Sequence, residues 1–187
     1  MLKLVVIKGH REGNYKIRYG IGMTHEEALE DLRKDFRLQD NYTGSFWTYE
    51  TIVNCENKTY VNIPDHWKSK WGLVWIYWFF HWLAVNMTAI KYFHRIYPFH
   101  DIDKPIKVTM GIPYIEVNRA HKFAKHHVKH RMASEVRWKE AICDWEASAF
   151  SKPQAPLNAL GTWYKYFRDT YQRKEFVIRE LERAKLI

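Results

Sequence analysis

The stretch "WGLVWIYWFFHWLAVNMTAI", from Trp71 to Ile90, contains no Lys, Arg, Asp or Glu. Its tryptophans recur at the i, i+4, i+7 and i+11 spacing of one stripe along a helix, at Trp71, Trp75, Trp78 and Trp82. This pattern predicts a long helix from about residue 71 to 96, with the tryptophan stripe buried in the core. The rest of the fold is then expected to assemble around this helix.

The same stretch is also about as long as a helix that crosses a bilayer. Lys70 and Lys91 flank it, and Trp is common at membrane interfaces. His81 lies at its centre, however, and a polar group in lipid is costly there. We therefore favour a core helix and no membrane partner. The apolar run at the N-terminus is too short for a signal peptide, so a cytoplasmic location is expected.

Before this helix, the pattern changes to that of strands. Residues 2–8 and 15–20 predict two strands joined by a turn. A helix follows over residues 23–36, where Thr24 and Glu27 have the spacing of a capping box. The first residues of the chain therefore predict a hairpin and a helix.

The segment "FWTYETIVNCENKTYVNI", residues 46–63, predicts a second hairpin that turns near residues 54–57. From Trp71 onward the periodicity is helical, with further helices expected over about 113–131 and 133–151 and two more after "SKPQAPLN". The fold class is therefore α+β: a small N-terminal hairpin and helix unit, residues 1–66, precedes a mainly helical domain, residues 67–187.

A loop between Pro98 and Pro105, "PFHDIDKP", concentrates polar groups directly after the long apolar helix. His100, Asp101 and Lys104 all lie in it. A surface turn accounts for the prolines but not for an imidazole, a carboxylate and an ammonium together. The two prolines are expected to restrict the loop.

Two helical segments downstream offer partners for these groups. "AHKFAKHHVKHR" contains histidines at helical spacing, which can hold a divalent metal or form a basic face that binds nothing: His121, His126, His127 and His130. In "EAICDWEAS", Asp144 lies between apolar neighbours, where a carboxylate needs a partner. That partner is either a metal or a nearby Arg or Lys, and Glu140 lies one turn earlier on the same face.

The ordered set His81, His100-Asp101, His121, His126-His127 and Asp144 resembles the HD superfamily of metal-dependent phosphohydrolases. "HDIDK" is similar to the "HDIGK" stretch of many members, with Asp103 in the glycine position. The segment from "FHDIDK" to the C-terminus also looks like a family of uncharacterised HD-like proteins found largely in phages and bacteria. The resemblance covers roughly the C-terminal half of the chain.

This resemblance implies a set of metal ligands, of which His81 or His94 is the first: His81, His100, Asp101 and Asp144. Asp101 is then expected to bridge to a second ion held by His121 and by His126 or His127. Lys104 would face a substrate phosphate, with Lys122 and Lys125 nearby to attract an anion. The cofactor would be one or two divalent ions: Mn, Fe, Co, Ni, Zn or Mg.

The formal net charge of +9 favours anionic partners. We expect a metal-dependent phosphohydrolase or phosphodiesterase acting on a nucleotide, a nucleotide-derived phosphate ester or another phosphorylated small molecule, in a host cytoplasm if the chain is of phage origin. The alternative is a non-catalytic basic phage factor that binds nucleic acid or a host protein. Two cysteines without a spacing motif indicate no disulfide framework.

Overall fold

The computed structural model describes residues 2–11, 14–35, 46–55, 64–123, 134–151, 157–168 and 174–187. The chain divides into two compact units. The first contains residues 1–56 together with 160–187, and the second contains residues 57–159. The described part combines an antiparallel sheet near the N-terminus with a mainly helical remainder, which confirms the predicted α+β class.

The sheet of the first unit has the strand order β2-β1-β3. Its strands are β1 (Lys3–Arg11), β2 (Asn14–Gly22) and β3 (Phe46–Asn54), and β1 pairs antiparallel with both neighbours. β3 is the first strand of the predicted second hairpin. The second strand of that hairpin falls on residues 56–63, which lie outside the described residues.

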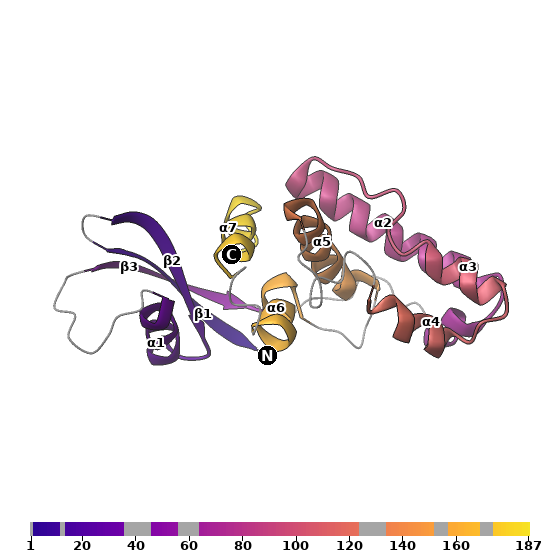
Figure 1. The fold of residues 1–187 in the computed structure, drawn as a ribbon, viewed down its shortest axis with the longest axis horizontal. Helices are drawn as coiled ribbons and strands as arrows, with labels where there is room; N and C mark the ends of the chain where they lie inside the picture. Colours follow the sequence, from indigo (N-terminus) through magenta and orange to yellow (C-terminus); the bar gives the residue numbers. More distant parts are fainter. Residues whose placement is uncertain are drawn as a thin grey trace. The chain divides into compact units, whose positions relative to one another are not determined.

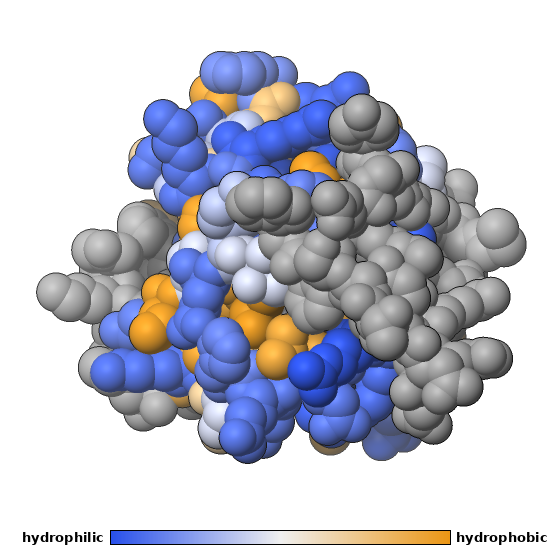
Figure 2. Space-filling view, turned by 90° about the vertical axis from the view of Figure 1, so that its left-hand side faces the viewer, coloured by the Kyte–Doolittle hydropathy of each residue, from blue (hydrophilic) through white to orange (hydrophobic). Residues whose placement is uncertain are grey.

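Helix α1 (His25–Asp35) packs on the sheet (Figure 1). Ala28 and Leu32 of α1 form one buried cluster with Val5 and Ile7 of β1. The approach is close, because a Cβ on Gly20 would lie 1.9 Å from the Ala28 carbonyl oxygen. Figure 2, which shows the left-hand side of Figure 1, has mostly hydrophilic residues among its coloured atoms.

The predicted N-cap of α1 is confirmed at Thr24, and Glu27 reaches back as predicted but bonds Met23 instead of Thr24. The Thr24 hydroxyl accepts the N–H of Glu27 at 3.2 Å, and the Glu27 carboxylate accepts the N–H of Met23 at 2.8 Å. The reciprocal bond therefore uses the residue before the cap.

The C-terminal helix α7 (Lys174–Arg183) belongs to the first unit. Its Glu182 carboxylate accepts the Tyr19 hydroxyl at 2.7 Å and pairs with Lys8 at 3.3 Å. From the sequence, this helix was expected in the domain over residues 67–187. An amphipathic pattern shows that α7 has a face to bury but does not identify the surface that it covers.

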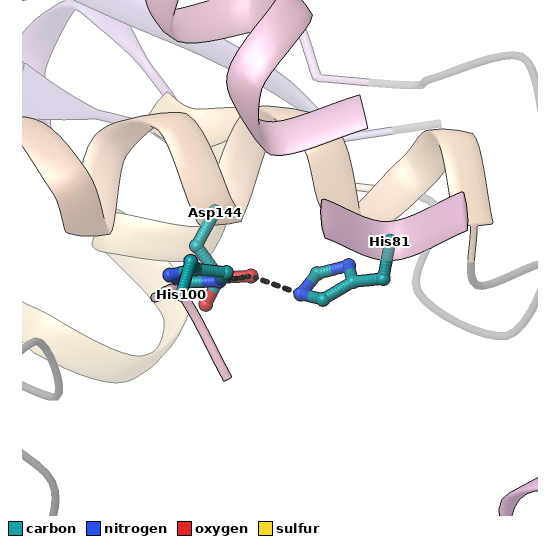
Figure 3. Close-up of side chains that lie close together, drawn as sticks. All are labelled: His81, His100 and Asp144. Carbon is teal, nitrogen blue, oxygen red and sulfur yellow. Dashed lines mark ion pairs between the residues drawn. The ribbon is translucent and has the colours of Figure 1, made fainter. Parts of the chain in front are cut away.

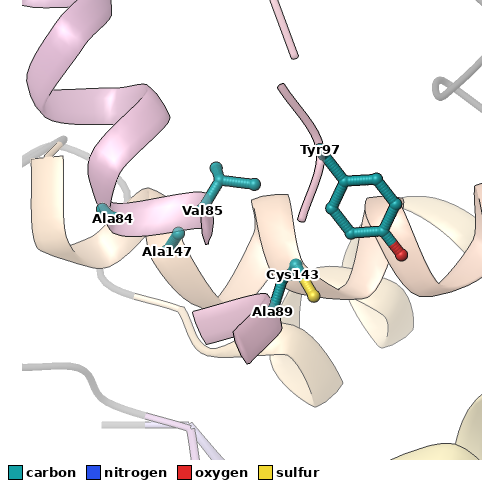
Figure 4. Packing of buried hydrophobic residues seen from close by; sticks show 6 residues of the cluster. All are labelled: Ala84, Val85, Ala89, Tyr97, Cys143 and Ala147. Atoms are coloured by element: carbon teal, nitrogen blue, oxygen red, sulfur yellow. The ribbon is translucent and has the colours of Figure 1, made fainter. Parts of the chain in front are cut away.

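The second unit is built on α2 (Leu73–Phe93) and α5 (Glu135–Ser151), which lie side by side (Figure 1). Small side chains line the contact and let the two backbones approach (Figure 4): Ala84, Val85 and Ala89 on α2 meet Cys143 and Ala147 on α5, with Tyr97 beside them. The shorter elements of this unit are η1 (Asp65–Ser69), α3 (Asp103–Thr109) and α4 (Tyr114–His121). Helix α6 (Ala159–Phe167) begins at Ala159, which is the last residue of the second unit.

The prediction of a buried tryptophan stripe on α2 is wrong. Trp71 is 76% exposed and Trp75 is 37% exposed. The indole N–H groups of Trp78 and Trp82 donate to the carbonyls of His100 and Pro98. The buried face of α2 consists instead of smaller or polar side chains that fit against their neighbours: Val74, Tyr77, His81, Ala84, Val85, Asn86 and Ala89.

By length and composition, α2 is the one described helix that is long and apolar enough to cross a membrane. Within the apolar 18-residue stretch of this helix, 39% is buried inside the protein.

The segment predicted as a loop between the two prolines is partly helical. A turn carries His100 and Asp101, and α3 begins at Asp103. Pro105 lies in the first turn of α3, where a missing N–H costs nothing. The helix predicted over 113–131 corresponds to α4, which ends at His121. Residues 124–133 lie outside the described residues.

Candidate metal centre

Three histidine and aspartate side chains from separate segments of the second unit converge (Figure 3). His81 lies in the middle of α2, His100 in the turn before α3, and Asp144 on α5. One ligand atom from each lies within 4.8 Å of the others. Asp101 adjoins them, and we call the four residues the His/Asp cluster.

Both imidazoles direct their Nε2 atoms toward the carboxylates of Asp101 and Asp144. His81 Nε2 lies 3.2 Å from Asp144 Oδ1 and 3.4 Å from Asp101 Oδ2. His100 Nε2 lies 3.7 Å from Asp144 Oδ1 and 3.7 Å from Asp101 Oδ1. The two rings are 5.3 Å apart between centroids.

These separations fit a shared cation. Donors about 2.1 Å from a central ion lie about 3.0 Å apart in octahedral geometry and about 3.4 Å apart in tetrahedral geometry. The distances in the His/Asp cluster, from 3.2 to 3.7 Å, are close to this range. A mixed imidazole and carboxylate set suits Mn, Fe, Co, Ni or Zn better than Ca. The residues present could therefore hold a divalent metal.

Asp101 has an uncommon backbone conformation, with a φ of +58°. The left-handed region is disfavoured for most residues, and Asp and Asn tolerate it better than most. This conformation occurs in the turn directly before α3, where the chain brings adjacent His and Asp side chains to one cluster. The backbone strain and the convergence of side chains therefore occur at the same residue.

Glu140 forms a hydrogen bond with Nδ1 of His100, the ring nitrogen that does not face the carboxylates of the cluster. Its Oε1 lies 3.2 Å from His100 Nδ1, and its Oε2 accepts Arg137 at 2.6 Å. A carboxylate on the second nitrogen fixes the orientation of a metal-binding imidazole. Burial alone would lower the pKa of His100, but the carboxylates of Asp101, Asp144 and Glu140 outweigh burial and raise it to about 10.

Beyond the His/Asp cluster, Asp101 binds two further cationic groups. Its Oδ1 lies 2.7 Å from His121 Nε2, and its Oδ2 forms an ion pair with Lys104. His121 Nδ1 in turn lies 3.0 Å from Asp103. Burial lowers the pKa of His121, but Asp101 and Asp103 outweigh it and raise that pKa. Asp101 is thus the residue on which this polar network centres.

The polar network is buried except at Asp103, whose side chain is 39% exposed. The side chains of His81, His100 and Asp101 are 0 to 3% exposed, whereas Asp144 is 10% and Lys104 is 13% exposed. Charged groups buried in this way are normally paired or bound to metal. Asp144 and Lys104 are thus slightly more accessible than the other buried members of the network.

The structure thus brings together seven of the residues singled out in the sequence or adjoining them: His81, His100, Asp101, Asp103, Lys104, His121 and Asp144. Of the two candidates for first ligand, His81 lies in the cluster, while His94 is an exposed residue that ends α2. Lys122 is exposed just after α4. His126, His127 and Lys125 lie outside the described residues.

The roles of Glu140 and Asp103 were not predicted from the sequence. Glu140 lies four residues before Asp144, so the two share a helix face, and that spacing was the available signal. For Asp103 there was no comparable signal, because it stands where the resemblance expects glycine.

Compared with protein-family models, curated proteins and solved structures, the chain matches none.

Proposed function

We propose that this protein is a metal-dependent phosphohydrolase or phosphodiesterase acting on a nucleotide or a nucleotide-derived phosphate ester. The observation that carries the proposal is the convergence of His81, His100, Asp101 and Asp144 at separations that suit one cation. The resemblance of the ordered His and Asp residues to the HD superfamily supports the type of reaction.

The four residues of the His/Asp cluster would hold the ion, with Glu140 orienting His100 through its second nitrogen. A divalent ion in such a site supplies Lewis acidity and lowers the pKa of water, which is the chemistry that hydrolysis of a phosphate ester needs. Asp101 joins the cluster to His121, the residue expected to contribute to a second ion.

Lys104 is the natural contact for a substrate phosphate. It is the most exposed of the side chains in direct contact with Asp101, and its ammonium already pairs with Asp101 beside the cluster. A fixed positive charge at this position would complement a phosphate bound beside the cluster. Lys122, exposed after α4, would add to the positive potential of the second unit.

The proposal is tested by metal content and phosphate release on the same preparations. Purified wild-type protein is analysed for bound Mg, Mn, Fe, Co, Ni and Zn and assayed against a panel of nucleotides. His100→Ala and Asp144→Ala are expected to lose both the metal and phosphate release. The matched control is His94→Ala, which removes an exposed histidine outside the cluster and is expected to leave both unchanged.

A wild-type protein that binds none of these metals would overturn the proposal. So would phosphate release that survives both cluster substitutions. Metal binding without phosphate release from any nucleotide would reject the nucleotide substrate and retain only the metal centre.

A further inference from the structure

Helix α2 exposes a continuous apolar face. Its residues follow the i, i+4, i+7, i+11 and i+14 spacing of one helix side and are 36 to 58% exposed: Ile76, Phe80, Leu83, Met87 and Ile90. We call this set the apolar face of α2. Phe79 beside it is 48% exposed. Contiguous exposed apolar surface of this kind marks a protein or membrane contact.

The opposite face of α2 is buried against the rest of the second unit. Ala84, Val85 and Ala89 pack on α5 (Figure 4), and His81 belongs to the His/Asp cluster. A helix crossing a bilayer alone would have to give up these contacts and place His81 in lipid. The apolar face can therefore meet a membrane only from the side, with α2 lying along the surface.

The charges at the two ends of α2 favour a membrane over a second copy of the chain. Between Asp65 and Asp101 the sequence has no Asp or Glu. Exposed Lys70 lies just before α2, and exposed Lys91 and Arg95 lie at its end. Two copies packed through this face would bring like charges together in either orientation, which costs affinity. An anionic lipid surface would instead pair with the basic groups at both ends.

Exposed aromatic side chains near the ends of α2 point to the same occupant. Trp71, before the helix, is 76% exposed, and Phe99, after it, is 80% exposed. Trp is favoured at the boundary between headgroups and acyl chains, and Phe is common on the apolar side of interfacial segments. A helix with an apolar side, basic ends and aromatic neighbours has the features of an interfacial membrane contact.

We propose that the second unit docks peripherally on an anionic lipid surface through the apolar face of α2. The helix lies in the membrane plane, its apolar side chains enter the headgroup boundary, and Lys70, Lys91 and Arg95 contact anionic headgroups. The expectation of no membrane partner assumed that α2 is enclosed as a core helix. The exposed face removes that assumption.

The test is co-sedimentation of the full-length protein with vesicles of phosphatidylcholine alone or mixed with phosphatidylglycerol. We expect binding to the anionic vesicles that weakens with added salt and is much lower for neutral vesicles. The double substitution Phe80→Gln with Met87→Gln is expected to weaken binding by at least about tenfold, because it removes two apolar groups from the contact. Lys91→Glu with Arg95→Glu is expected to weaken binding to anionic vesicles only.

The matched control is Met23→Gln with Ile52→Gln. These two side chains are 55% and 65% exposed and lie in the first unit. They are expected to leave vesicle binding unchanged. Circular dichroism and metal content of every variant report whether the fold and the His/Asp cluster are intact, so loss of vesicle binding is separated from loss of the metal centre.

Three results would overturn the proposal. The first is no binding to either kind of vesicle. The second is vesicle binding that the α2 substitutions leave unchanged. The third is a concentration-dependent dimer in size-exclusion chromatography that the α2 substitutions dissociate, with no vesicle binding, which assigns the face to a second copy.

Discussion

Nδ1 of His100 lies 3.2 Å from Oε1 of Glu140, while Nε2 of the same ring faces Asp101 and Asp144. The two residues are separated by 40 positions in the chain. The contact fixes which nitrogen of His100 faces Asp101 and Asp144. A metal site needs this arrangement, because the ligand nitrogen must present its lone pair inward.

Glu140→Gln is expected to weaken divalent metal binding by roughly 10- to 100-fold, because an amide orients and polarises the imidazole less well than a carboxylate. Titration with Co²⁺, followed by absorbance or calorimetry, measures the change. Glu135→Gln, an exposed position on the same helix, is the control and is expected to bind Co²⁺ as the wild type does. Equal affinity of Glu140→Gln and wild type would refute the orienting role.

Metal is expected to stabilise the second unit through the His/Asp cluster. A ligand at a hundred times its dissociation constant adds about 2.7 kcal/mol to the free energy of unfolding. Adding Mn²⁺ or Zn²⁺ to chelator-treated wild-type protein should therefore raise its melting temperature. Asp144→Asn, which keeps the side-chain shape but removes the charge, should show little rise. A rise of the same size in Asp144→Asn would place the bound metal elsewhere.

The left-handed backbone of Asp101 predicts a difference between two substitutions. Both Asp101→Gly and Asp101→Ala remove the carboxylate. Only Ala places a Cβ at a φ of +58°, where a Cβ is destabilising. Asp101→Gly should be more stable than Asp101→Ala by about 1 kcal/mol in urea unfolding.

The control for this comparison is Asp103, which begins α3. There Ala is favoured over Gly because the backbone is helical, so the order of the two variants is expected to reverse by up to about 1 kcal/mol. If Asp101→Ala proved the more stable variant at position 101, the left-handed conformation would be refuted.

Glu146, two positions after Asp144 on α5, is expected to make the stability of the fold depend on pH. Burial raises the pKa of its carboxyl above the ordinary value of 4.5, although the Ala159 N–H and Lys91 act in the opposite direction. A carboxyl whose pKa is higher in the folded state stabilises the fold below its unfolded pKa and loses that contribution as pH rises through the folded value. The stability advantage of wild type over Glu146→Gln should therefore shrink as pH rises from below 4.5.

Urea unfolding of both proteins across this pH range measures the difference. Gln keeps an acceptor for the Ala159 N–H, which lies 2.8 Å from the Glu146 carboxylate. Glu116→Gln, on the exposed side of α4, controls for removal of a surface charge. A difference that grows with pH would contradict the predicted sign.

Much of the local structure follows from short-range patterns. The cap formed by Thr24 and Glu27 fixes the start of α1, and the apolar run after Trp71 gives the long helix α2. Both depend on spacing within a few turns, which a sequence displays directly. The order of His and Asp residues likewise singled out the members of the cluster before their positions in space were known.

What the sequence determined by itself is therefore the type of each element and the residues whose chemistry needs partners. Only the tertiary structure decided which faces meet. Alanines at positions 84 and 89, rather than the tryptophans, face α5, because close helix packing depends on the shape of both surfaces. The selection of His81 over His94 and the pairing of Glu140 with His100 were decided in the same way, since such contacts depend on distances in space that spacing along one chain does not contain.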